Sequence, residues 1–214
     1  MFKKTLLLIF IIAIFINLSA VSKTMNLRAG FLVPNDAKTG FIGGLCYGTK
    51  FDESISLYFS SDYFYKNYSK IKKIGFHTSS GGNNVSEMQK SADITNYYLP
   101  MMGNLQVNFP LRNEVKSYGS VGLGYGLLWE KVFVAANQEE DTGKIDDVKF
   151  YSGFNWNISA GVKTKLGGNS SIYGEIFYNG GVMKRNLKAD DYGVTWDQID
   201  MSGIGMRIGV ELRY

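Results

Sequence analysis

The segment IGMRIGVELRY, residues 204–214, carries the clearest pattern in the sequence. Every second residue is apolar, and these are Ile204, Met206, Ile208, Val210, Leu212 and Tyr214. The residues between them are charged or lack a side chain, and these are Gly205, Arg207, Gly209, Glu211 and Arg213. Successive side chains of a β-strand point to opposite faces, so the alternation predicts a strand that separates an apolar environment from a polar one.

Two kinds of β-barrel could contain such a strand. In a soluble barrel the charged side chains would face water, and the apolar side chains would fill the interior. In a membrane barrel the apolar side chains face lipid, and the charged side chains face the interior. The other segments of the chain distinguish these alternatives.

Alternation of the same kind recurs in segments of roughly ten residues or more, the length that a tilted transmembrane strand requires. It predicts seven further strands, at about 25–33, 41–51, 54–65, 93–109, 117–133, 150–166 and 171–180. Pro100 falls inside one of them, where a β-bulge is the usual accommodation of a proline. No segment after about residue 22 shows the period of an amphipathic helix.

The connections between these strands alternate in length. Short turns are predicted at 52–53, 110–114 and 167–170, and long polar loops near 66–92, 135–147 and 183–198. Short turns at one end and long loops at the other are typical of an even-numbered antiparallel membrane barrel, whose long loops are extracellular. We therefore predict an all-β fold, an antiparallel eight-stranded transmembrane β-barrel spanning residues 23–214.

The aromatic residues favour the membrane alternative, because they gather near the strand ends. Rings expected near the long loops are Tyr63, Tyr65, Tyr97, Trp129, Phe133, Phe154, Trp156 and Tyr178. Rings expected near the short turns are Phe51, Phe109 and Tyr214. Two such groups match the interfacial girdles of a membrane barrel, and a soluble barrel has no reason to sort its aromatic residues in this way.

The N-terminal segment predicts secretion. Lys3 and Lys4 precede an apolar run at 6–16, and small residues follow it, which is the order of a signal peptide. Cleavage is expected after Ala20 or after Ser22, so residues 1–22 form the predicted signal peptide. The alternative, an uncleaved membrane anchor, is disfavoured because the apolar run is short for a membrane span.

Charge and cysteine content exclude several classes of protein. The formal net charge is +4 and falls to +2 without Lys3 and Lys4, so the sequence gives no case for nucleic-acid binding. Cys46 is the single cysteine and cannot form an intramolecular disulfide bond, which excludes a disulfide-stapled secreted domain. One cysteine and one histidine cannot form a zinc site by themselves, so no metal or cofactor site is expected.

The sequence resembles the small outer-membrane β-barrel family, which includes the opacity-type surface proteins and the membrane domain of outer membrane protein A. The resemblance rests on the N-terminal segment, the alternating strands, NLQVNFP at 104–110 and RIGVELRY at 207–214. It covers essentially the whole predicted mature chain and is specific for architecture rather than activity. It implies a multi-pass protein of the outer membrane of a Gram-negative bacterium.

The same resemblance implies a role for the C-terminal strand as the signal that the barrel-assembly machinery recognises. The residues that would carry this signal are Val210, Leu212 and Tyr214. In this sequence the terminal aromatic residue is tyrosine, whereas phenylalanine is commoner in the family.

An outward apolar face places ionisable side chains inside the barrel. An eight-stranded barrel is just wide enough for its interior to be filled by side chains, so these charges must be paired or hydrated. We predict a closed polar lumen, and a narrow ion path that opens when pairs break is the alternative. The predicted structural network comprises Arg28, Lys50, Asp62, Glu130, Lys163, Glu175, Arg207, Glu211 and Arg213.

These features predict a structural or surface-interaction role in the outer membrane, with specificity in the extracellular loops. A small porin or a transporter of small solutes is the alternative, and a lipid-modifying enzyme is a third. No catalytic site is expected, because His77 lies beside Ser79 and Ser80 without an evident third group to orient it. Expected partners are outer-membrane lipids, lipopolysaccharide phosphates near the lysines of residues 66–73, the barrel-assembly machinery and a surface ligand.

Overall fold

The structure, a computed structural model, describes residues 22–76, 86–112, 114–134, 145–186 and 196–214. The predicted signal peptide, residues 1–22, lies outside the described residues except for Ser22. The described part of the chain holds no helix with the length and hydrophobicity that crossing a membrane requires. Its strands are β1 (Lys23–Pro34), β2 (Gly40–Lys50), β3 (Ile55–Phe76), β4 (Ser86–Arg112), β5 (Val115–Val134), β6 (Ile145–Gly167), β7 (Ser170–Gly180), β8 (Val182–Asn186), β9 (Trp196–Asp200) and β10 (Gly203–Arg213).

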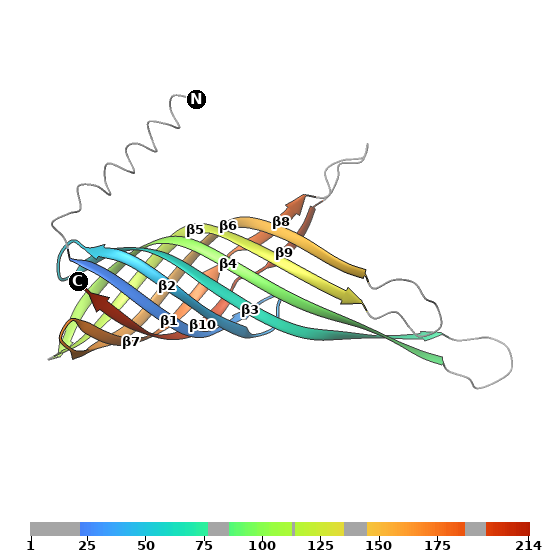
Figure 1. Ribbon diagram of the computed structural model, residues 1–214, viewed down its shortest axis with the longest axis horizontal. Helices are drawn as coiled ribbons and strands as arrows, with labels where there is room; N and C mark the ends of the chain where they lie inside the picture. Colours follow the sequence, from blue (N-terminus) through green and yellow to red (C-terminus); the bar gives the residue numbers. More distant parts are fainter. Residues whose placement is uncertain (1–21, 77–85, 113, 135–144, 187–195) are drawn as a thin grey trace, which may run out of the picture.

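Eight of these strands close into an antiparallel barrel (Figure 1). Strands β1 to β7 pair in sequence order, and β10 then pairs with both β7 and β1. The closing pairs run from Thr24↔Arg213 to Pro34↔Gly203, so no edge of the barrel sheet stays unpaired along this seam. The predicted eight-stranded antiparallel barrel is confirmed.

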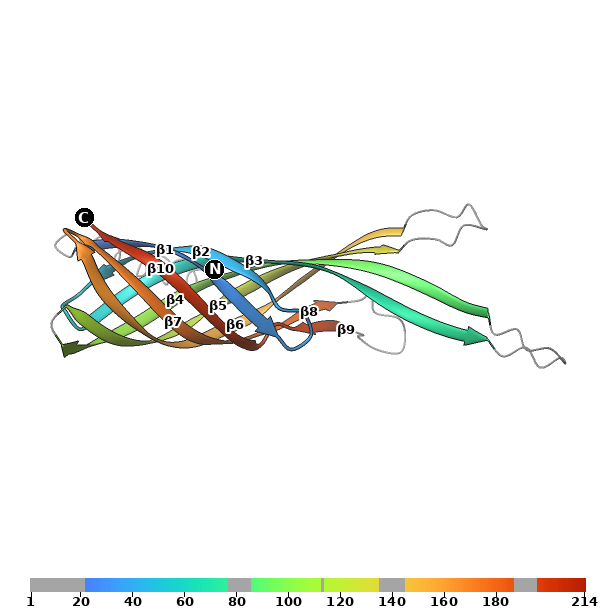
Figure 2. The same cartoon turned by 90° about the horizontal axis from the view of Figure 1, so that it is seen from below.

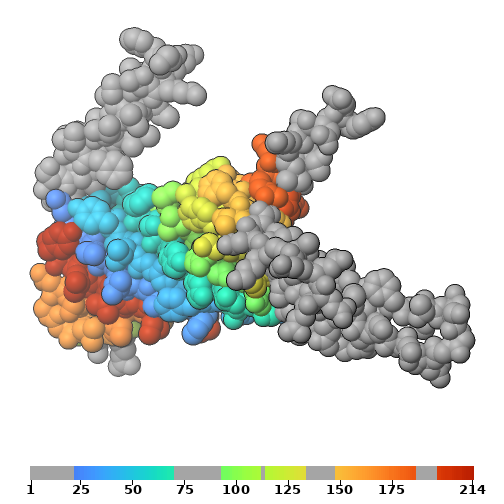
Figure 3. Space-filling view, turned by 45° about the vertical axis from the view of Figure 1, so that its right-hand side comes forward, coloured from blue at the N-terminus to red at the C-terminus, as the bar shows by residue number. Residues whose placement is uncertain are grey.

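The closing strand β10 separates two environments, as its alternation predicts. Ile208 is 69% exposed, whereas Arg207 and Glu211 are 4% and 1% exposed. The same sorting holds around the wall. Large apolar side chains cover the outside, and the charged side chains that are buried lie inside, namely Arg28, Asp62, Lys163, Glu175, Arg207 and Glu211. Figure 3 shows this outer wall, on which β1, β2 and β10 lie side by side. The free energy of such a surface is favourable against lipid and unfavourable in water, which identifies a membrane barrel.

Aromatic rings pack against one another near the long-loop end of the outer wall. Ring centroids lie 5.5 Å apart for Tyr65 and Tyr97, and 5.4 Å apart for Trp156 and Tyr178. At the short-turn end the predicted rings are exposed on the outside, and these are Phe51, Phe109 and Tyr214. The two girdles expected from the sequence are present in the structure.

The tract 66–92 is not the irregular loop that the sequence predicts. Strands β3 and β4 continue through most of it as a ladder from Lys66↔Asn96 to Phe76↔Ser86, and only residues 77–85 lie outside the described part. Figure 2 shows the β3–β4 hairpin reaching well beyond the barrel. Above the membrane both faces of a strand meet water, so the ladder persists there without the apolar alternation that reveals it in the membrane.

The other two predicted loops are also partly strand. Ile145–Asp147 belong to β6 and pair with β5, and residues 135–144 lie outside the described part. Strands β8 and β9 form a hairpin, Val182↔Asp200 to Asn186↔Trp196, where the sequence predicts a loop at 183–198. Residues 187–195 lie outside the described part. Each strand is five residues long, too short for a clear period.

Pro100 is accommodated without the predicted β-bulge. The β3–β4 pairing is interrupted between Ser61↔Met101 and Phe64↔Tyr98 and resumes in the same register. On the other side the pair Pro100↔Gly126 is kept with β5. Proline lacks the N–H group of a ladder hydrogen bond, and the structure therefore omits a short piece of one ladder rather than inserting a residue.

Candidate functional site: the filled interior of the barrel

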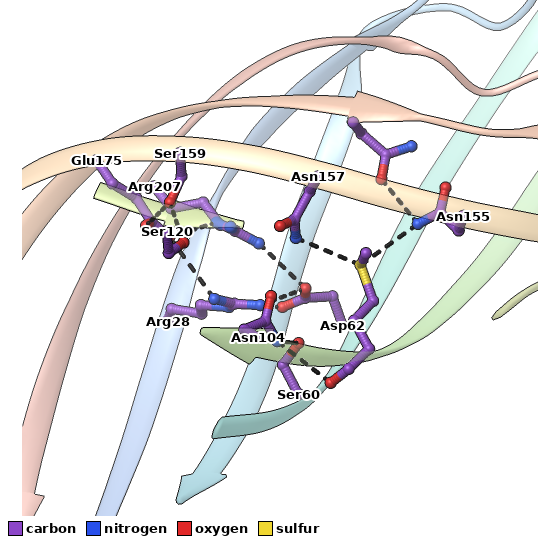
Figure 4. A network of polar contacts seen from close by, with 12 residues as sticks. Arg28, Ser60, Asp62, Asn104, Ser120, Asn155, Asn157, Ser159, Glu175 and Arg207 are labelled. Atoms are coloured by element: carbon purple, nitrogen blue, oxygen red, sulfur yellow. Dashed lines mark hydrogen bonds and ion pairs between the residues drawn. The ribbon is translucent and has the colours of Figure 1, made fainter. Parts of the chain in front are cut away.

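The middle of the barrel holds two arginines and two carboxylates, here named the four-charge cluster: Arg28, Asp62, Glu175 and Arg207. Arg28 donates from Nε to Asp62 Oδ1 at 2.8 Å and from Nη2 to Asp62 Oδ2 at 2.6 Å. Arg207 donates from Nη1 to Asp62 Oδ2 at 3.0 Å and from Nε to Glu175 Oε1 at 2.8 Å. The cluster is electrically neutral, and all four side chains are buried (Figure 4).

Register explains why these four side chains meet. Arg28 pairs with Gly44 and Gly209 on its two neighbouring strands, and Gly44 in turn pairs with Asp62. A β-carbon on Gly44 would lie 2.2 Å from Asp62 Oδ1. The missing side chain at Gly44 therefore leaves the space through which Arg28 reaches Asp62 across an intervening strand.

Hydroxyl groups complete the hydrogen bonding of the four-charge cluster. Tyr118 Oη and Ser159 Oγ both donate to Glu175 Oε2 at 3.1 Å. Ser120 Oγ lies 2.7 Å from Ser159 Oγ and extends this chain to the next strand. Buried carboxylates are stable only when such donors replace the lost water, so the cluster is a fully supported ionic core.

A second group of charges lies nearer the short-turn end and is here named the Glu211 cluster. Glu211 Oε1 accepts from Lys50 Nζ at 2.9 Å and from Arg213 Nε at 3.1 Å. Its Oε2 atom accepts from Lys163 Nζ at 3.1 Å. Three cations therefore share one carboxylate, and the side chains of Lys163 and Glu211 are only 4% and 2% exposed.

One level of the interior on the long-loop side of the four-charge cluster is apolar, where the sequence predicts a polar lumen. Here Ile42, Phe64, Tyr98, Leu128 and Tyr151 are directly paired neighbours across β2 to β6. All are at most 2% exposed and belong to one cluster. We name this cluster the apolar plug, and its further members are Leu32, Phe177, Met183, Ile199 and Met201.

The plug can be recognised in the sequence, although a search for strict apolar–polar alternation does not find it. At the height of the plug, the inward residue of a strand and its two outward neighbours are all apolar or aromatic. Examples are FLV at 31–33, YFY at 63–65 and LLW at 127–129. Such short apolar runs mark the height at which a strand is apolar on both faces. Met183 and Ile199 come from the β8–β9 hairpin, so the plug also needs a segment for which the sequence predicts a loop.

Between the plug and the short-turn end the interior holds little open space. A cavity of about 20 Å³ lies among Arg28, Tyr58, Tyr118 and Glu211 and other inward side chains. That volume accommodates about one water molecule. A larger recess of about 610 Å³ opens at the short-turn end and is lined in part by Lys50 and Lys163.

Eight of the nine predicted network residues fall into the two clusters, and the ninth lies apart. Glu130 Oε1 is 3.9 Å from Lys149 Nζ near the long-loop end of β5 and β6. The single predicted network is therefore two clusters and a separate site, because alternation assigns a residue to a face and not to a height along the barrel. Tyr118 connects the clusters, since it bonds Glu175 while Lys163 Nζ lies 5.5 Å from its ring.

The three residues of the predicted assembly signal face outward. Val210, Leu212 and Tyr214 are 37%, 50% and 65% exposed on the outer wall. The backbone of Tyr214 exchanges two hydrogen bonds with Lys23, at 3.0 and 3.2 Å. His77, the residue considered for catalysis, lies outside the described residues.

Comparison with known proteins identifies the fold. No family model matches the chain, and no curated protein matches it. OprG, an outer membrane protein of Pseudomonas aeruginosa, is similar with a TM-score of 0.53 and 11% identity, over 91% of this chain and 96% of that one. The chain has the fold of the small outer-membrane β-barrels. A major outer membrane protein of Thermus thermophilus is similar to a like degree, with a TM-score of 0.52, 12% identity and coverage of 90% of this chain and 99% of that one.

Proposed function

We propose that the protein is a closed multi-pass barrel of the Gram-negative outer membrane with a structural or surface-interaction role. The observation that carries the proposal is the filled interior within an apolar outer wall. The apolar plug, the four-charge cluster and the Glu211 cluster follow one another along the barrel, at the levels of Ile42, Gly44 and Lys50 on β2. The proposal assigns no catalytic reaction to the protein.

The packing of these layers supports a closed lumen over the alternative of a small porin. A conducted ion would have to displace the plug side chains and separate buried ion pairs such as Arg28–Asp62. Breaking a buried pair leaves an uncompensated charge and is strongly unfavourable. The cavity of about 20 Å³ between the clusters has room for about one water molecule, which supports the proposal over a water-filled pore.

The projecting hairpins support ligand contacts at the long-loop end. Strands β3 and β4 continue as a ladder to Phe76↔Ser86, and β5 and β6 to Val134↔Ile145. These extensions carry the far ends of β3, β4, β5 and β6 well beyond the barrel (Figure 2). Connections held by a rigid scaffold are the usual place for recognition, so we assign surface specificity to this end.

The outer rim supports contact with lipopolysaccharide. Lys131 Nζ lies 5.7 Å from the ring of Tyr97, within the aromatic girdle. Further lysines lie in residues 66–73 of β3. Ammonium groups beside an interfacial ring suit the phosphates of a lipid head group, whereas the ring suits the boundary of the acyl layer.

Planar-bilayer recording of the pure protein tests the closed barrel, together with fractionation of cells that express it. We expect the protein in the outer membrane, with heat-modifiable mobility on gels and no steady conductance above that of lipid alone. Steady, large, ohmic conductance would overturn the closed lumen and favour the porin alternative. Recovery as a soluble periplasmic monomer would overturn the assignment to the membrane.

A further inference from the structure

The recess at the short-turn end, here named the vestibule, is rich in positive charge. Its volume is about 610 Å³, and its lining includes Lys50 and Arg213 at the ends of β2 and β10. Figure 1 shows that β1 begins and β10 ends at this end of the barrel. Its cationic lining residues are Lys50, Lys116, Lys163, Lys165 and Arg213. Its acidic lining residues are Asp52, Glu53 and Glu114.

The charges on the floor of the vestibule do not balance. Lys50, Lys163 and Arg213 each contact the single carboxylate of Glu211, at 2.9, 3.1 and 3.1 Å. Two positive charges are therefore in excess at one small site, whereas the four-charge cluster above it is neutral. Like charges held this close repel one another, and the lysine ammonium groups have lost much of their hydration, so a bound anion would stabilise the site.

Among the ion pairs of the described residues, Asp52, Glu53 and Glu114 are not paired with Lys50, Lys163 or Arg213. Asp52 Oδ1 accepts the backbone N–H groups of Ser54 and Ile55, at 2.6 and 2.7 Å, and so holds the turn after β2. The side chain of Glu53 is 94% exposed and lies 3.4 Å from Lys116. Among the described residues, the floor cations have Glu211 as their one carboxylate partner.

We propose that the vestibule binds a multivalent oxyanion, a phosphate or a polycarboxylate, on Lys50, Lys163 and Arg213. Two ammonium groups and one guanidinium provide several N–H donors around one position. This arrangement suits phosphate and carboxylate groups, because their oxygens accept charge-assisted hydrogen bonds. The volume falls within the range of small-ligand sites, about 300–1,000 Å³, and exceeds what a single inorganic ion fills. The site requires only that the short-turn end be in contact with water.

Calorimetric titration of the folded protein in neutral detergent tests this inference, with pyrophosphate and citrate as probes and sodium chloride at matched ionic strength as the reference. We expect saturable binding of at least one probe and none with chloride. Stronger binding of pyrophosphate identifies a phosphate site, and stronger binding of citrate identifies a carboxylate site. Absence of saturable binding to the wild-type protein overturns the proposal.

Variants separate the site from general attraction to a basic protein. Lys163→Met should weaken binding about tenfold or more, because it removes a charge-assisted donor. Arg213 lies at the partly exposed rim of the cluster, so Arg213→Gln should weaken binding without threatening the fold. Lys38 is exposed in the connection between β1 and β2 at the opposite end of the barrel, and Lys38→Met should leave binding unchanged. Equal affinity in Arg213→Gln and the wild type, with both folded, would contradict the proposal. Bilayer conductance does not enter this test, so its failure would leave the closed barrel unaffected.

Discussion

At the scale of single residues, interior charge is tolerated here because each carboxylate is surrounded by donors. Glu175 accepts from Arg207 through one oxygen and from Tyr118 and Ser159 through the other. Glu211 is surrounded by three cations. Both groups have low exposure, and their cost of desolvation is offset by these contacts rather than by water.

Replacing Glu175 by glutamine should strongly destabilise the barrel. The change leaves Arg28 and Arg207 with the carboxylate of Asp62 but without that of Glu175. It also points an amide N–H₂ group toward Tyr118 and Ser159, which donate hydrogen bonds to Glu175. We therefore expect the free energy of unfolding to fall by about 3–5 kcal/mol. Urea-induced unfolding in lipid vesicles measures the effect. Glu53→Gln is the matched control, because Glu53 is 94% exposed and should change stability by less than about 1 kcal/mol. Equal unfolding midpoints for the two variants would show that the four-charge cluster does not stabilise the fold.

The junction between β9 and β10, beyond the last closing pair of the barrel, predicts a pH dependence. Asp200 is partly desolvated, which raises its pKa, but hydrogen bonds from Asn35 Nδ2 and the backbone N–H of Ser202, both at 2.8 Å, outweigh this and lower its pKa. A lowered pKa means that the contribution of Asp200 to stability is present above its ordinary pKa and is lost as the pH falls through the lowered value. Asn35→Ala should raise the pKa of Asp200, as measured by NMR titration of the carboxyl carbon. An unchanged pKa would show that Asn35 does not hold the carboxylate in solution.

At the scale of elements, β10 has an apolar outer face and an inner face of charged residues and glycine. Val210 faces outward and Glu211 inward, although they are adjacent in sequence. Val210→Arg should reduce the folded fraction in membranes, because arginine near the midplane costs about 2–4 kcal/mol. The heat-modifiable fraction on gels measures insertion, and Val210→Ile is the control with an unchanged apolar face. Wild-type insertion of Val210→Arg would mean that this position does not face the lipid core.

The β8–β9 hairpin stabilises the barrel through the side that faces the plug. Met183 is fully buried, whereas the preceding Val182 is 37% exposed. Met183→Ala should lower the free energy of unfolding by about 2–5 kcal/mol, because it leaves a cavity, and Val182→Ala should lower it much less. Urea-induced unfolding compares the two. Similar losses in both would indicate that the hairpin is not packed into the barrel.

The elements that the sequence predicts well are those for which the membrane enforces a period. Ile208 and Arg207 are assigned to opposite faces because lipid and interior differ so strongly. The sequence does not predict the ladder from Lys66 to Phe76. Water contacts both faces of the strands there, so no alternation of apolar and polar residues is required. The candidate site shows the same limit. Alternation predicts that Glu130 and Glu175 both face the interior. Only the register between strands determines their heights along the barrel, and it places Glu130 away from the four-charge cluster.

At the scale of the whole molecule, the closed lumen that we propose consists of filled layers along one path. The apolar plug contains Ile42 and Phe64, and the next inward positions toward the short-turn end are Gly44 and Asp62, at the four-charge cluster. A path through the barrel must cross both layers. Each layer spans the interior with side chains from several strands, so removal of one leaves the other in place.

This arrangement predicts that conductance appears only when the plug, the four-charge cluster and the buried Lys163–Glu211 pair are all removed. Tyr98→Ala with Met183→Ala thins the plug, and alanine at all four positions of the four-charge cluster removes that layer without changing the net charge. We expect either set alone to stay silent in planar bilayers, because barriers in series each suffice to block an ion. The combined variant, with Lys163→Ala and Glu211→Ala added to remove the buried pair of the Glu211 cluster, should conduct, provided that its heat-modifiable mobility shows a folded barrel. Conductance from the plug variant alone would show that the four-charge cluster does not close the lumen. Conductance from the variant of the four-charge cluster alone would show that the plug does not close it.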